Sequence, residues 1–111
     1  MNKLTDKKCV ACEGGEIKPI PKSEAERLIL EIEGWIIDTK GKKINKEFQF
    51  KNFDKAMDFV NMVADLAEME GHHPDITILY NKVDLTLTTH AIKGLSENDF
   101  ILAAKINGIR L

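Results

Sequence analysis

The sequence predicts an α+β domain in two layers, in which an antiparallel four-stranded sheet carries helices on one face. Three observations lead to this class. Helix and strand patterns follow one another in the order α-β-β-α-β-β-α, the strands occur in pairs joined by short turns, and residues 53–70 have the periodicity of one long helix. Short turns join antiparallel neighbours, so the strand pairs are expected to form one antiparallel sheet. The helices between and around them must then bury their apolar faces against that sheet.

The composition is that of a single soluble globular domain. The chain has 111 residues, of which 43% are hydrophobic and 31% are charged, and a chain of this length buries one core without help from a metal or disulfide. The formal net charge of -2 argues against a nucleic-acid-binding protein. Because the sequence has no membrane-spanning apolar run and no secretory signal at its start, we expect a cytoplasmic protein without a membrane partner.

We expect residues 1–22 to form an N-terminal arm and residues 23–111 to form the folded domain. The arm contains both cysteines, Cys9 and Cys12, at a spacing that also occurs in zinc sites and redox pairs. No second such pair completes a zinc site, and the motif continues into a Glu-Gly-Gly loop instead of a helix. Reduced cysteines are therefore favoured, with metal or redox behaviour as the alternative.

The first helix is expected to begin after Ser23, which has Glu26 three residues later and so forms a capping box. Two strands follow, at residues 35–39 and 44–50, around a glycine turn. In the second of these strands Lys46 interrupts an otherwise apolar face.

Two more helices are predicted. Residues 53–70 form the long helix, with Asn52 as its cap and Gly71 as its left-handed end, and Ser96 with Asp99 caps a last helix. The apolar arc of the long helix is wider than one sheet face covers. Either a second helix or a partner subunit is expected to cover the surplus.

The two strands after the long helix are predicted to form a hairpin with Asn81-Lys82 as its turn. In that register Tyr80 faces Val83, and extending the ladder brings His73 opposite His90.

All three histidines of the chain, His72, His73 and His90, are thus expected to meet where the long helix joins the hairpin. Glu68 lies one helical turn before His72 and points to the same region. Histidine suits proton transfer because its pKa lies near neutrality. The residues alone leave three interpretations open: acid–base catalysis, a metal site, and a structural or binding role.

A set of residues at fixed spacings resembles the signature of a known family. The set consists of Glu68, His72, His73, Pro74, Tyr80, His90 and Asp99. This signature is similar to that of the pterin-4a-carbinolamine dehydratases, and the resemblance covers roughly residues 23–109. The Cys9-x-x-Cys12-Glu-Gly-Gly string also resembles an N-terminal element of many bacterial members.

The resemblance implies a hydro-lyase reaction. The substrate would be 4a-hydroxytetrahydrobiopterin, the form in which aromatic amino acid hydroxylases leave their tetrahydropterin cofactor. Its 4a-hydroxyl would leave as water, which gives the quinonoid dihydropterin for recycling. The resemblance implies no cofactor and no metal.

The resemblance also implies roles for individual residues. His72 and His90 would be the principal acid–base groups, and His73 would hold the 4a-hydroxyl or share in proton transfer. Glu68 would orient an imidazole, and Asp99 would support the site, although capping of the last helix also explains it. The residues expected to border the pterin are Pro74, Thr88, Thr89 and Trp35.

The resemblance implies a homodimer or homotetramer, for which the wide apolar arc gives an independent reason. Two departures from the family pattern, Asp75-Ile76 and Asn98, leave the preferred pterin side chain open. The alternative to an enzyme is a binding or dimerisation module that stabilises a protein partner without catalysis.

Overall fold

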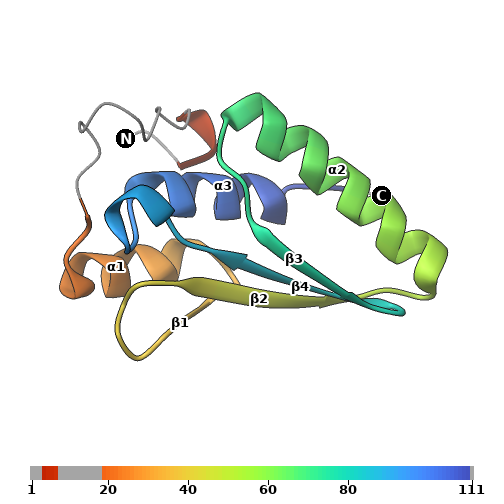
Figure 1. Ribbon diagram of the computed structural model, residues 1–111, viewed down its shortest axis with the longest axis horizontal. Helices are drawn as coiled ribbons and strands as arrows, with labels where there is room; N and C mark the ends of the chain where they lie inside the picture. Colours follow the sequence, from red (N-terminus) through yellow and green to blue (C-terminus); the bar gives the residue numbers. More distant parts are fainter. Residues whose placement is uncertain (1–3, 8–18, 111) are drawn as a thin grey trace.

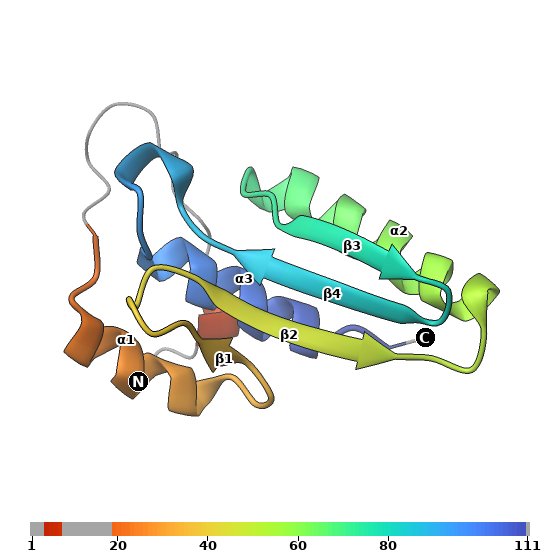
Figure 2. The same cartoon turned by 60° about the horizontal axis from the view of Figure 1, so that its bottom comes forward.

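The computed structural model describes residues 4–7 and 19–110. Four antiparallel strands form one sheet in the order β1-β2-β4-β3, and the helices lie on one side of it (Figures 1 and 2). The strands are β1 (Ile36–Ile37), β2 (Ile44–Gln49), β3 (Asp75–Leu79) and β4 (Lys82–Leu87), and the α-helices are α1 (Lys22–Leu28), α2 (Phe53–Glu70) and α3 (Glu97–Asn107). Short 3-10 turns are η1 (Leu4–Asp6), η2 (Ile29–Glu31) and η3 (His90–Ile92). The predicted fold class is confirmed.

The predictions for the N-terminal arm are not tested by this structure. Cys9 and Cys12 lie outside the described residues, so their chemical state stays a prediction. The division of the chain at residues 22 and 23 also stays a prediction.

Helix α2 has the bounds and both ends that the sequence predicts. The Asn52 side chain accepts a hydrogen bond from the Lys55 amide at 2.9 Å, which satisfies one free donor of the first turn. Gly71 ends the helix in the left-handed region with φ +67°, and its amide donates to the Ala67 carbonyl. This turn directs the chain out of the helix and into the two histidines that follow.

The core lies between the central strand β4 and the helices. The inward residues Val83, Leu85 and Leu87 of β4 are fully buried, and α3 is buried along most of its length. Helix α2 contacts both β4 and α3, so a second helix does cover part of its apolar arc. Met62 and Met69 nevertheless stay 40% and 72% exposed. A partner subunit over this remainder stays a prediction.

Lys46, which interrupts the apolar face of β2, connects the segment before β1 with the end of α3. Its ammonium group donates to the Glu33 carbonyl at 3.0 Å and to the Asn107 side chain at 2.9 Å. It also lies 4.7 Å from the centre of the Phe48 ring. Burial of the ammonium lowers the pKa of Lys46. The lysine stem therefore serves as core packing while its charged end binds backbone and side-chain oxygens.

The predicted turn of the β3–β4 hairpin is wrong by one residue. Tyr80 and Asn81 form the turn, and Leu79 pairs with Lys82. Two hydrogen bonds anchor Asn81 to the end of β2: its carbonyl accepts from the Phe50 amide at 2.8 Å, and its side chain donates to the Phe50 carbonyl at 3.0 Å. Tyr80 therefore adopts the positive φ of 53°, which the sequence analysis assigned to the asparagine.

The facing pairs predicted for this hairpin are wrong for the same reason. Val83 pairs with Ile78 and not with the turn tyrosine. A shift of two residues leaves every side chain on its predicted face, because strands alternate with a period of two. If the observed register is continued beyond the ladder, however, His73 meets Thr88 rather than His90.

Two predictions in the first third of the chain are also corrected. Helix α1 begins at Lys22 with Pro21 at the cap position, and no side chain caps it, so the capping box at Ser23 does not form. Pro21 itself has an extended backbone with ψ 150°, so the helix begins only after it. Strand β1 is limited to two residues because Asp38, directly after it, accepts hydrogen bonds from the following turn.

We predict that Gly71→Ala destabilises the protein by about 1 kcal/mol, because a side chain is strained in the left-handed region. The new methyl group meets no atom within 4 Å, so the cost is conformational and not steric. Urea unfolding measures it. Gly71→Asn is the matched control and should cost less, since asparagine tolerates this conformation; an equal loss for both variants would contradict the explanation.

Candidate active site

All three histidines line one cleft of about 190 Å³. His72 and His73 follow the left-handed end of α2, and His90 begins η3, which Thr88 and Thr89 separate from the end of β4. The remaining lining residues are Gly71, Thr88 and Ala91. The structure thus brings the three imidazoles together, although the hairpin register on which the prediction relied is different.

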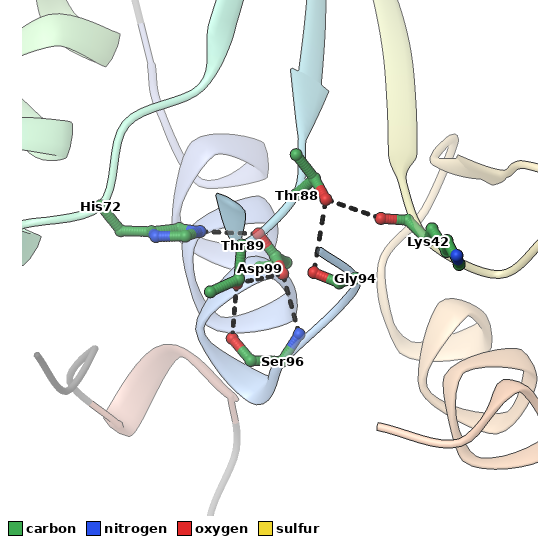
Figure 3. A network of polar contacts seen from close by, with 7 residues as sticks. All are labelled: Lys42, His72, Thr88, Thr89, Gly94, Ser96 and Asp99. Atoms are coloured by element: carbon green, nitrogen blue, oxygen red, sulfur yellow. Dashed lines mark hydrogen bonds and ion pairs between the residues drawn. The ribbon is translucent and has the colours of Figure 1, made fainter. Parts of the chain in front are cut away.

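His72 is held by a buried carboxylate on α3. Its Nε2 lies 2.6 Å from Oδ1 of Asp99 (Figure 3). Asp99 is completely buried, and His72 is only 6% exposed. The second carboxylate oxygen of Asp99 accepts from the Thr89 hydroxyl at 2.8 Å and from the Ser96 amide at 2.9 Å. The predicted capping box of α3 is therefore present, and the same carboxylate also binds the histidine.

This network indicates which nitrogen of the His72 ring carries hydrogen. The Thr89 hydroxyl and the Ser96 amide both donate to Asp99, so its carboxyl group acts as an acceptor. His72 then donates through Nε2–H, so in the neutral ring Nδ1 is the unprotonated nitrogen. Figure 3 shows Nδ1 on the side of the ring away from Asp99. Nδ1 is therefore the atom of His72 with a free lone pair.

His73 and Glu68 form a hydrogen-bonded pair at the surface. The Nε2 of His73 contacts the Glu68 carboxylate, and both side chains are largely exposed. Exposed pairs of this kind contribute little to the free energy of unfolding. The pair can nevertheless fix the direction of the imidazole at the rim of the cleft.

Two threonines tie the end of β4 to its surroundings. The Thr88 hydroxyl lies 2.7 Å from the Lys42 carbonyl and 3.3 Å from the Gly94 carbonyl (Figure 3). Thr89 pairs with Gly94 as an isolated bridge and donates to the buried carboxylate described above. The loop that carries His90 is therefore closed on itself and bound to the loop between β1 and β2.

Two residues expected to border the substrate do not line this cleft. Pro74 is half-buried between the histidine pair and β3. Trp35 is buried in the core, and its indole N–H donates to the Asn107 side chain at 3.0 Å. Their contact with substrate stays a prediction.

The cleft also contains two residues that the sequence analysis did not assign to the site, Gly71 and Ala91. Their positions directly before and after site histidines were the available signal, and their small size leaves room for a ligand. Within residues 4–7 and 19–110, no three His, Cys, Asp or Glu side chains are grouped so as to hold a metal ion. In the same part of the chain, no helix has the length and apolar character needed to cross a membrane.

Comparison with known proteins identifies one family. The family model described as pterin 4 alpha carbinolamine dehydratase matches residues 18–109. A protein of Nitrosospira multiformis is 51% identical over 104 residues, which are 94% of this chain and 89% of that one. A protein of Halorhodospira halophila is 45% identical over 96% of both chains. The names of both assign them provisionally to the pterin-4-alpha-carbinolamine dehydratases.

A mitochondrial relative from Arabidopsis thaliana, pterin-4-alpha-carbinolamine dehydratase 2, is 42% identical over 97% of this chain and 59% of its own length. Two solved structures are also similar. A transcriptional coactivator/pterin dehydratase from Brucella melitensis has a TM-score of 0.78 at 34% identity, covering 82% of this chain and 97% of that one. A pterin dehydratase-like RuBisCO assembly factor of the alpha-carboxysome has a TM-score of 0.59 at 26% identity, covering 68% and 87%.

We predict that Asp99→Asn changes the hydrogen position on His72 and destabilises the fold by about 1–3 kcal/mol, since an amide cannot accept from all three donors. Nitrogen-15 NMR of the histidine rings should report Nε2–H in the wild type and a shift toward Nδ1–H in the variant. Urea unfolding gives the stability.

Ser96→Ala is the matched control, because it removes the capping hydroxyl and leaves the His72–Asp99 contact in place. It should lower stability by about 1 kcal/mol without moving the ring hydrogen. An unchanged His72 ring in Asp99→Asn would show that the carboxylate does not set its hydrogen position.

Proposed function

The chain belongs to the pterin-4a-carbinolamine dehydratase family, and we propose that it dehydrates 4a-hydroxytetrahydrobiopterin to quinonoid dihydropterin and water. The observation that carries the proposal is the cleft in which three imidazoles meet, one of them fixed by a buried carboxylate. A cleft of this size accommodates part of a heterocyclic ligand, and Thr88 and Thr89 are proposed to border the ring together with Pro74.

The reaction consists of two proton transfers around one bond cleavage. The C4a–O bond breaks, a proton delivered to the leaving hydroxyl makes it water, and the proton on ring nitrogen N5 is removed. We assign these transfers to His72 and His90, because histidine is the side chain that most often serves as a general acid or base. The atoms balance without an oxidant, a metal or an organic cofactor.

The surroundings of His72 support its role as a proton carrier. With Nε2–H donated to Asp99, Nδ1 lies on the far side of the ring and is the nitrogen that can accept a proton. Asp99 is then a positioning residue, since it acts through the imidazole. His73, oriented by Glu68 at the rim, is proposed to hold the 4a-hydroxyl or to share in proton transfer.

The proposed setting is tetrahydropterin recycling in the cytoplasm, in functional connection with an aromatic amino acid hydroxylase. We also propose that the protein works as a homodimer or homotetramer. The exposed methionines of α2, Met62 and Met69, support association, because large apolar side chains gain free energy when a second subunit covers them. Trp35 is proposed to shield one rim of the site.

A second candidate function is a binding module that stabilises a protein partner without catalysis. The names of the two similar structures favour it, since one is a transcriptional coactivator and the other is a RuBisCO assembly factor. In that case the wild-type chain would bind a partner stoichiometrically and would not accelerate loss of the 4a-hydroxypterin.

We predict that His72→Ala and His90→Ala each lower the dehydration rate by about 10²–10⁴-fold, the usual contribution of one acid–base group. Stopped-flow absorbance follows the disappearance of 4a-hydroxytetrahydropterin with and without protein. Lys82→Ala, at the distant hairpin end, is the matched control and should retain the wild-type rate.

Circular dichroism and urea unfolding establish that each variant is folded. The acid–base assignment is rejected if folded His72→Ala and His90→Ala both keep the wild-type rate. A wild-type protein with no acceleration at all would instead favour the binding module.

A further inference from the structure

A second cleft adjoins the cleft of the three histidines, which we call the histidine cleft. The second is lined by three lysines and is called the lysine cleft. Its volume is about 300 Å³, and its lining residues are Lys42, Lys43, Thr88, His90 and Lys93. Thr88 and His90 also line the histidine cleft. A molecule bound beside His90 can therefore extend from one cleft into the other.

The backbone that carries the first two lysines is held in place. Asp38 accepts hydrogen bonds from the amides of Lys42 and Lys43 at 2.7 and 3.1 Å. The Thr88 hydroxyl lies 2.7 Å from the Lys42 carbonyl on the other side. Partial burial by itself raises the pKa of Asp38. The hydrogen bonds from these amides and the charge of Lys43 outweigh that effect and hold the pKa below its usual value. The loop is thus fixed relative to His90 by contacts from both sides.

The third lysine occupies a conformation that a lysine rarely adopts. Lys93 has φ +53° and ψ +42°, in the left-handed region where glycine or asparagine is usual. Its amide lies 3.2 Å from the His90 carbonyl, so the turn that positions this ammonium also positions the imidazole. Strained backbone of this kind persists where the surroundings over-determine it, which is common at ligand sites.

Within the described part of the chain, the lysines of this cleft form no ion pair at contact distance. Among the described residues, no carboxylate lies within 4 Å of the ammonium groups of Lys42, Lys43 or Lys93, and no acidic side chain lines the cleft. Asp38 is nearby: it accepts hydrogen bonds from the Lys42 and Lys43 amides, and the charge of Lys43 helps to lower its pKa. The chain as a whole has a net charge of -2, so this concentration of positive charge is opposite in sign to the whole.

We propose that the lysine cleft binds an anionic group, a phosphate or a carboxylate, on the side chain of the pterin whose ring lies in the histidine cleft. This inference rests on the proposed function and adds a substrate class to it. The histidine cleft is smaller than the ~300–1,000 Å³ usual for ligand sites, so a whole substrate extends beyond it. The adjoining space is lined by three lysines, and phosphate and carboxylate are anions that lysine ammonium groups bind.

The test compares three ligands by isothermal titration calorimetry. They are a neutral reduced pterin with a hydroxylated side chain, the same pterin with a phosphate monoester on that side chain, and a reduced pterin with a side-chain carboxylate. We expect at least one anionic pterin to bind about tenfold more tightly than the neutral one at low salt, with the advantage shrinking as salt is added.

The matched variants are Lys43→Gln/Lys93→Gln in the cleft and Lys51→Gln/Lys82→Gln, which remove the same charge at the opposite end of the sheet. The cleft variant should reduce the ratio of anionic to neutral affinity toward one, while the distant variant should keep it near the wild-type ratio. The phosphate and carboxylate arms identify which anion is bound.

Equal affinities for neutral and anionic pterins in the wild type would overturn the inference and leave the proposed function intact. An equal fall of the ratio in both double variants would also overturn it, because the effect would then come from net charge. Failure of every pterin to bind, the neutral one included, would overturn the inference together with the proposed function. Binding of the neutral pterin therefore distinguishes failure of the inference alone from failure of both.

Discussion

The carboxylate of Asp99 is the contact on which the site depends, because three separate segments meet at it. Its oxygens accept from the turn after α2 through His72, from the end of β4 through Thr89, and from the first turn of α3 through Ser96. A fully buried carboxylate is stable only when its hydrogen-bonding capacity is used. Within the described chain no buried side-chain nitrogen or oxygen lacks a partner, and this network meets that requirement at the site.

The same carboxylate therefore links folding to chemistry. As part of a capping box it accepts a hydrogen bond from the Ser96 amide, one of the free donors at the start of α3, the helix that forms much of the core. As the partner of His72 it holds an imidazole at the edge of a cleft with a defined hydrogen position. One residue serves both purposes because the N-terminus of α3 lies against the segment that follows β4, where Thr89 donates to Asp99. Loss of the helix cap and loss of the imidazole's orientation are consequently expected to occur together.

Several features could be predicted from the sequence because they depend on neighbouring residues. The bounds of α2 follow from Asn52 and Gly71, which act within one helical turn, and the capping box of α3 follows from the spacing of Ser96 and Asp99. The faces of the hairpin strands follow from a period of two. The turn was misplaced because Asn81 is anchored by Phe50, a contact between residues 31 positions apart that no local pattern contains.

The sequence by itself determined the fold class, the long helix and the set of three histidines with its family resemblance, since each rests on local periodicity or on the spacing of residue types. Only the tertiary structure decided how the histidines are placed. It showed that His72 is buried against Asp99 and that His73 lies at an exposed rim with Glu68. It also showed that His90 lines both the histidine cleft and the lysine cleft. These differences arise from burial and from contacts between distant segments, and such contacts exist only after the chain has folded.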